Sequence, residues 1–131
     1  METELAGLMI VDRIDEEAGM PSGVGGITTG ITVSAFPAMV GPGLWVFGLL
    51  YGGSRTTVLH FVVTHVADPP VEVYREAVAI RAAPSPLAAC PLSHHLERVS
   101  LPGSGAYRME LVEPSSGRRL GGTWLIVDES P

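Results

Sequence analysis

The chain of 131 residues contains no lysine, asparagine or glutamine, so all eight of its basic residues are arginine. The codons of the three missing residues all contain adenine, which indicates a G+C-rich bacterial genome rather than a function. Only 17% of the residues are charged and 46% are hydrophobic, a composition that excludes intrinsic disorder. The formal net charge of -6 argues against nucleic-acid binding, because phosphate contacts need clustered cations. We therefore expect a single folded domain over residues 1–131.

Cysteine is nearly absent. Cys90 stands alone and has no partner for an internal disulfide, so nothing indicates an oxidising compartment. Glu2 and Glu4 occupy the region where a secretory signal would carry positive charge, and the apolar stretch that follows them is too short for a secretory core. We expect a cytoplasmic protein.

Long unbroken hydrophobic runs are missing as well, although no charge occurs between Ala18 and Ser54. A membrane-spanning helix needs about 20 consecutive apolar residues. Glycines and prolines interrupt this stretch, and its longest clean piece runs only from Leu44 to Tyr51. That length is typical of a buried strand, so we expect no membrane segment.

Sixteen glycines and eleven prolines separate short runs of β-branched and aromatic residues, the pattern of an all-β protein. An acidic segment, 12–23, is expected to be a turn. The predicted fold is a single antiparallel β-sandwich of about eight strands with Greek-key, immunoglobulin-like topology, and a small closed β-barrel is the alternative. The expected strands are 5–11, 27–33, 44–51, 56–66, 71–83, 93–101, 105–113 and 118–129.

The segment 71–83 is ambiguous. As a strand it places Tyr74, Val78 and Ile80 on one side. As a helix it could be capped by Asp68, with the prolines that follow in its first turn. Its neighbours are all strands, which favours the strand.

The segment from Leu101 to Tyr107 resembles a tyrosine corner, in which a tyrosine hydroxyl binds the backbone a few residues upstream in Greek-key sandwiches. Met109 stands where immunoglobulin domains have their second disulfide cysteine, and we expect it to fill the core instead.

Four features spread over nearly the whole chain resemble a family of small bacterial proteins catalogued as domain of unknown function 6941. They are a first strand ending in Asp12, a glycine-rich strand 25–27 leading to 36–38, an apolar strand 44–50, and a Gly-x-Tyr strand 105–111 whose hairpin ends at 121–125. The acidic segment before Pro21 and the loop 84–91 depart from this pattern. The resemblance implies a β-sandwich and no known activity, so it assigns no functional residue.

Four histidines raise the question of a metal site, since neutral imidazole is a common zinc ligand. Adjacent strand residues point to opposite faces, which separates His94 from His95, and the odd spacing separates His60 from His65 in the same way. No Cys-x-x-Cys or His-x-x-x-His spacing supplies further ligands. We predict strand histidines, no metal site and no cofactor.

Carboxylates between Asp12 and Glu17 are too irregularly spaced for a calcium loop, so we expect a solvated turn.

Cys90 with His94 or His95 could activate a thiolate, but no nearby cation lowers the cysteine pKa. Three serines, Ser22, Ser85 and Ser93, are candidate nucleophiles, but none lies in a G-x-S-x-G elbow. The glycine-rich segment Gly23–Gly26 does not indicate a phosphate-binding loop, because it precedes a strand rather than a helix.

We expect five aromatic residues on the predicted strands to lie in the hydrophobic core: Trp45, Phe47, Tyr51, Phe61 and Trp124. If some of them face outward, an apolar patch rimmed by polar residues would mark a partner interface. The leading hypothesis is therefore a non-enzymatic protein-interaction or assembly module that binds a protein partner or itself as a homodimer. The alternative is a small β-barrel enzyme or small-molecule carrier, with Tyr74, His60 or His65 lining a pocket.

Overall fold

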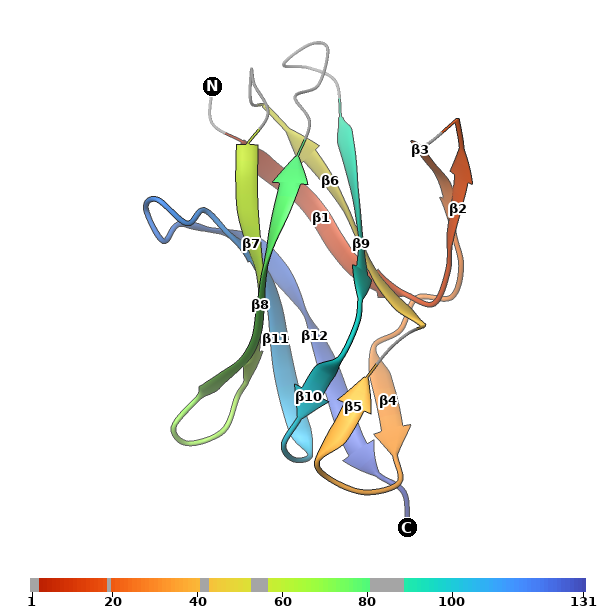
Figure 1. Ribbon diagram of the computed structural model, residues 1–131, viewed down its shortest axis with the longest axis vertical. Helices are drawn as coiled ribbons and strands as arrows, with labels where there is room; N and C mark the ends of the chain where they lie inside the picture. The colour runs from red at the N-terminus through yellow and green to blue at the C-terminus, as the bar shows by residue number, and fades with distance from the viewer. Residues whose placement is uncertain (1–2, 19, 41–42, 53–56, 81–88) are drawn as a thin grey trace.

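The computed structural model describes residues 3–18, 20–40, 43–52, 57–80 and 89–131 (Figure 1). Every regular element among these residues is a strand, which confirms the all-β prediction. The described residues contain no helix long and apolar enough to cross a membrane. The strands are β1 (Glu4–Val11), β2 (Ile14–Glu17), β3 (Met20–Val24), β4 (Gly30–Val33), β5 (Ala38–Val40), β6 (Leu44–Tyr51), β7 (Thr57–His65), β8 (Val71–Ile80), β9 (Cys90–Leu96), β10 (Val99–Leu101), β11 (Gly105–Val112) and β12 (Arg119–Glu129).

Two larger sheets and two small ones make up the fold. The five-stranded sheet has the order β4-β12-β11-β7-β8, and the three-stranded sheet has the order β1-β6-β9. β2 pairs with β3, and β5 pairs with β10. The described strands thus form separate hydrogen-bonded sheets and do not close into one barrel.

Two details of the predicted strand pattern are wrong. The described residues hold twelve strands rather than about eight, because β2, β3 and β5 form outside the expected strands and the expected strand 93–101 divides into β9 and β10. One pair is also parallel: Ile126–Glu129 of β12 runs beside β4. Alternation of apolar and polar residues defines the faces of a strand but not the direction of its partner, so the sequence pattern could not reveal this pairing.

The predicted strand 93–101 divides into two. Its first part belongs to β9, which pairs with β6, and its last part is β10, which pairs with β5. Between them Arg98 has a φ of 55°, a left-handed conformation that interrupts an extended chain. The ambiguous segment is a strand over Val71–Ile80, as favoured, and residues 81–83 lie outside the described part of the chain.

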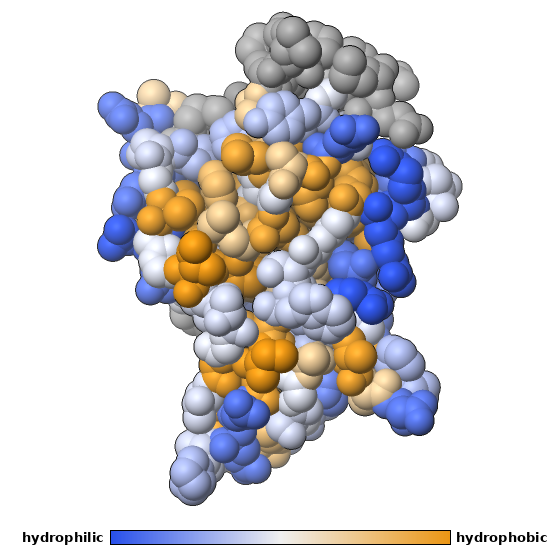
Figure 2. Space-filling model, turned by 180° about the vertical axis from the view of Figure 1, so that it is seen from behind, coloured by the Kyte–Doolittle hydropathy of each residue, from blue (hydrophilic) through white to orange (hydrophobic). Residues whose placement is uncertain are grey.

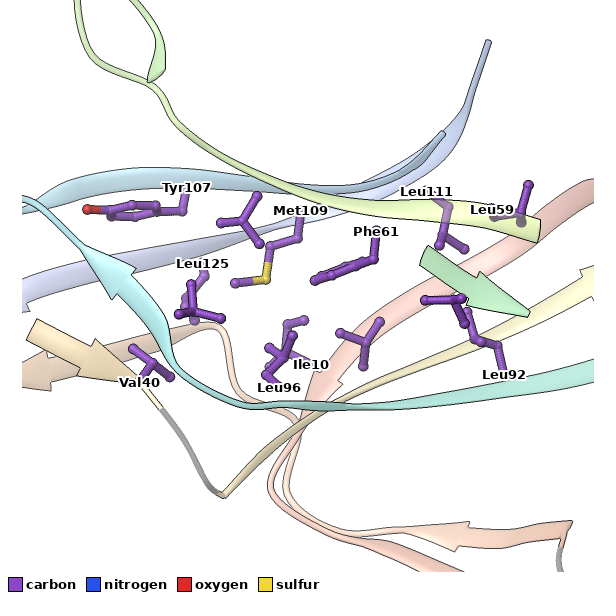
Figure 3. Packing of buried hydrophobic residues seen from close by; sticks show 14 of the residues in the cluster. Ile10, Val40, Leu59, Phe61, Leu92, Leu96, Tyr107, Met109, Leu111 and Leu125 are labelled. Atoms are coloured by element: carbon purple, nitrogen blue, oxygen red, sulfur yellow. The ribbon is translucent and has the colours of Figure 1, made fainter. Parts of the chain in front are cut away.

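A single cluster of buried side chains lies between the two larger sheets (Figure 3). Ile10 and Leu96 reach it from the three-stranded sheet, and Phe61, Met109 and Leu125 reach it from the five-stranded sheet. All five side chains are at most 1% exposed. Burying an aliphatic or aromatic side chain stabilises a fold by about 1.5–3 kcal/mol, so this cluster is the main source of stability. Met109 fills the core as expected.

Tyr107 forms the predicted backbone contact. Its hydroxyl donates a hydrogen bond of 2.6 Å to the carbonyl oxygen of Gly103 and lies 3.3 Å from the Gly103 amide nitrogen. The ring is fully buried and stacks on His65, with centroids 4.5 Å apart. This contact joins the start of β11 to the loop before it.

The two larger sheets meet at two corners. At one corner β1 contacts β12, and at the other β8 contacts β9, without a hydrogen-bonded ladder at either place. β1 and β12 lie at the rear of Figure 1 and therefore toward the viewer in Figure 2. On that side, hydrophobic surface gathers in the centre and hydrophilic residues lie on both flanks (Figure 2).

Candidate functional surfaces

The outer face of the three-stranded sheet is apolar at its centre. Along β6 the buried residues Val46 and Leu50 point into the core, so the alternate residues point outward. These outward residues are Trp45, Phe47 and Leu49, all of which are half-buried. β6 is thus covered completely on one face and only partly on the other.

Neighbouring strands extend this apolar surface. Met9 of β1 lies opposite Phe47, and Pro91 of β9 lies opposite Leu49. His95 stacks on the indole of Trp45 with ring centroids 4.4 Å apart, which fixes the orientation of the indole. None of these residues is an acid or an arginine. We call Met9, Trp45, Phe47, Leu49, Pro91 and His95 the apolar sheet face.

Acidic residues border the apolar sheet face. The β2–β3 hairpin, whose second strand packs against β9, exposes Asp15, Glu16 and Glu17. Glu97, at the end of β9, lies 3.2 Å from His95. The segment predicted as a solvated turn is therefore a solvated hairpin. An apolar surface rimmed by polar residues is the arrangement found at interaction sites.

The remaining aromatic residues divide between core and surface. Phe61 is fully buried, as predicted. Tyr51 is 38% exposed at the end of β6, and Trp124 is 50% exposed on the outer face of the five-stranded sheet. The prediction of five core aromatics is therefore confirmed only for Phe61, because Trp45 and Phe47 also point outward from β6. The reason is that each sheet has only one covered face, and alternation places the other four rings on the opposite one.

At the corner between β8 and β9, polar groups cover the ring of Phe61. The hydroxyl of Tyr74 donates to the carboxylate of Glu76 and lies 3.2 Å from Nε2 of His94. His94 Nε2 also lies 3.5 Å from the Glu76 carboxylate. Both rings contact Phe61, with centroid distances of 6.1 Å and 5.9 Å. These groups protect the edge of β8, since inward-pointing polar groups discourage strand addition.

Burial controls the ionisation of this corner. Desolvation lowers the pKa of His94 below its usual value, and the Glu76 carboxylate opposes that shift. Desolvation, together with the hydrogen bond to Glu76, raises the pKa of the Tyr74 phenol. The imidazole is therefore held in its neutral form, and the phenol keeps its proton as a hydrogen-bond donor.

The structure does not bring the other predicted pocket residues to this corner. His60 receives a hydrogen bond of 2.9 Å from Arg75. His65 lies against Tyr107 and is 3.0 Å from the carbonyl oxygen of Ser104. His94 and His95 lie on opposite faces of β9, as predicted. The described residues contain no group of three or more His, Cys, Asp or Glu side chains that could hold a metal ion.

A hollow of about 260 Å³ opens on the outer face of the five-stranded sheet. Val62, which is 4% exposed, and Val112 are among the residues that line it, together with Pro114. Two charged pairs also line it, one from β8 and one from the β11–β12 hairpin. These are Glu72 with Arg75, and Glu110 with Arg119.

Glu110 is the only charged residue with a buried side chain among the described residues, at 6% exposure. Its carboxylate accepts a hydrogen bond of 2.7 Å from Nε of Arg108, and Nε of Arg119 lies 3.3 Å from its other oxygen. Charged residues are rarely buried unless they are paired, and these two guanidinium groups supply the pairing.

A glycine on the neighbouring strand makes room for this carboxylate. Gly122 lies opposite Glu110, and a Cβ at this position would be 2.2 Å from the carbonyl oxygen of Met109 and 3.0 Å from Cγ of Glu110. Only glycine fits such a close approach. The hollow was not predicted from the sequence. The one sequence feature that could have indicated it is the pair Gly121-Gly122 inside an apolar strand.

The other predicted candidates stay apart. Burial raises the pKa of the Cys90 thiol, which disfavours the thiolate that a nucleophile needs. Gly25 and Gly26 pack against the side chain of Asp12. Ser85 and the loop residues 84–88 lie outside the described part of the chain.

The chain was compared with family models, curated proteins and solved structures. None of the three comparisons finds a match. The resemblance to the family of domain of unknown function 6941 therefore remains a prediction.

Proposed function

We propose that the protein is a non-enzymatic interaction module that acts through its apolar sheet face, and that the partner at this face is a second copy of the chain. The supporting observation is the row of outward Trp45, Phe47 and Leu49 on the central strand of the three-stranded sheet. These side chains are less covered than core residues, and a partner would complete their burial.

The absence of charge at the centre of this face favours a second copy. In a two-fold dimer the same patch meets itself on the other copy. An uncharged patch is therefore self-complementary, whereas a patch with charges of one sign repels its copy. The acidic rim, with Glu16 and Glu17, then makes the association weaker at low salt. A partner with basic flanks would instead bind more weakly as salt is added.

The size of the face predicts a weak dimer. Three strands of seven or eight residues cover roughly 25 Å by 14 Å, or about 350 Å². A stable complex buries about 800 Å² on each partner, so this face gives less than half of that area. We therefore expect a reversible dimer in the micromolar range or weaker.

The test is sedimentation equilibrium of the purified chain at low and high salt. We expect association that increases with salt and is lost in Phe47→Glu. The matched control is Val58→Glu, which adds the same charge at a residue that is 47% exposed on another strand, and it should associate like the parent. A strict monomer at every concentration, or equal loss in both variants, contradicts the proposal.

The finer architecture is also part of the proposal. We infer that the two larger sheets pack as a β-sandwich of immunoglobulin-like, Greek-key type. The single core cluster with residues from both sheets supports this, as does the bond from Tyr107 to Gly103.

A further inference from the structure

The hollow on the five-stranded sheet has spare hydrogen-bond donors. Arg119 uses Nε toward Glu110, and its two terminal nitrogens make no hydrogen bond to any described residue. The side chain is 61% exposed, so these nitrogens are open to a ligand. The terminal nitrogens of a guanidinium are spaced to bind both oxygens of a carboxylate.

The pairing of charges in the hollow favours an anion. Two carboxylates, Glu72 and Glu110, and two guanidinium groups, those of Arg75 and Arg119, line it, so their formal charges balance. Each carboxylate is paired with an arginine, whereas the terminal nitrogens of Arg119 have no partner among the described residues. An anionic ligand can therefore bind there without breaking an internal pair.

Part of the lining of the hollow is apolar. Val112 and Pro114 contribute apolar atoms to a mainly polar lining, and Val62 lies behind them at 4% exposure. A volume of about 260 Å³ accommodates about nine groups the size of a water molecule, at roughly 30 Å³ each. A small organic acid with a compact hydrocarbon body matches this size, and its carboxylate matches the spare donors of Arg119.

We propose that this hollow is a binding site for a small organic carboxylate, with the carboxylate on the terminal nitrogens of Arg119 and the hydrocarbon body against Val112 and Pro114. Glu110 is a positioning residue, because it holds Nε of Arg119 and so directs the remaining nitrogens into the hollow. The site lies on a different sheet from the apolar sheet face and does not depend on the proposed dimer.

Benzoate is the probe, titrated into the ¹⁵N-labelled chain while amide chemical shifts are followed. We expect saturable shifts confined to β7, β11 and β12 around Val62, Val112 and Arg119. Benzamide has the same shape without the charge and should bind at least about tenfold more weakly, since a charge-assisted pair is lost. Arg119→Gln should weaken benzoate binding by a similar factor.

Two variants control for folding and for charge alone. Arg13→Gln removes an equal charge from an arginine that is 65% exposed and paired with Asp15 outside the hollow, and it should bind benzoate like the parent. Arg119→Lys keeps the charge but cannot bind a carboxylate in the bidentate way of a guanidinium, so its affinity for benzoate should fall between those of the parent and Arg119→Gln. The proposal is overturned if benzoate gives no saturable shifts up to its solubility limit. Shifts that benzamide reproduces, or affinity that both glutamine variants lower equally, overturn it as well.

Discussion

Asp12 and Gly26 form one packed unit where β1 ends. The amide of Asp12 donates a hydrogen bond of 3.1 Å to the carbonyl oxygen of Gly26, and a Cβ on Gly26 would lie 2.7 Å from the Asp12 carboxylate. Gly25 is equally close to the same side chain. Two features that the sequence resemblance treated separately, the end of the first strand and the glycine-rich segment, are therefore in direct contact.

Gly26→Ala should destabilise the fold. The new methyl group overlaps the Asp12 carboxylate, which is the exposed end of a side chain that can turn aside, so the expected loss is about 1 kcal/mol of unfolding free energy or less. Urea unfolding measures it. Gly7→Ala is the matched control, because a Cβ there meets nothing within 4 Å, and it should leave stability nearly unchanged. Equal effects at both positions would contradict the packing described here.

Gly122→Ala should have a larger effect than Gly26→Ala. Here the obstacle is the backbone carbonyl of Met109 at 2.2 Å, which cannot move without opening the pairing of β11 with β12. We expect a loss of more than about 3 kcal/mol, or a chain that fails to fold, since backbone overlap exceeds ordinary overpacking. Near-parent stability in the same urea experiment would show that the two strands are further apart than described.

Tyr107→Phe tests the bond to Gly103. The ring stays in the core, but the hydroxyl that donates at 2.6 Å is lost, which should cost about 1–2 kcal/mol. Tyr51→Phe removes the same hydroxyl from a ring that is 38% exposed and should be neutral. If the two substitutions have the same small effect, the Tyr107 contact contributes nothing beyond burial.

His94 should make the fold less stable in mild acid. Burial lowers its pKa in the folded chain below the usual 6.5, so between the two pKa values the unfolded chain binds more protons. The stability contributed by the neutral ring is therefore complete above about pH 6.5 and is lost as the pH falls toward the folded-state pKa. An NMR titration of the His94 ring should give a midpoint below 6.5, and a midpoint at or above 6.5 contradicts this account.

Strands with strong apolar or β-branched character could be predicted from sequence. β6 and β7 occupy nearly their predicted ranges because both runs are long and apolar or β-branched, and Gly48 is the only turn-forming residue within them. The hairpin of β2 and β3 was missed because Ile14–Glu17 is mostly acidic, and its pairing is local rather than driven by burial.

The candidate functional surfaces could be predicted from the sequence less well than the strands. Outward aromatic residues on β6 follow from alternation once one face is known to be buried, but no pattern shows which face that is. The hollow depends on the strand order β12-β11-β7-β8, which brings Arg119, Glu110 and Arg75 together across four strands. Strand order is a long-range property, and alternating charges on separate strands give no sign of it.

Amide chemical shifts as a function of protein concentration show whether the apolar sheet face is a contact surface between copies of the chain. On dilution, we expect shifts at Met9, Trp45, Phe47, Leu49 and His95 that follow a single dissociation curve, with the hollow unaffected. Shifts that are absent at all concentrations, or that fall on the five-stranded sheet instead, would contradict the proposed contact.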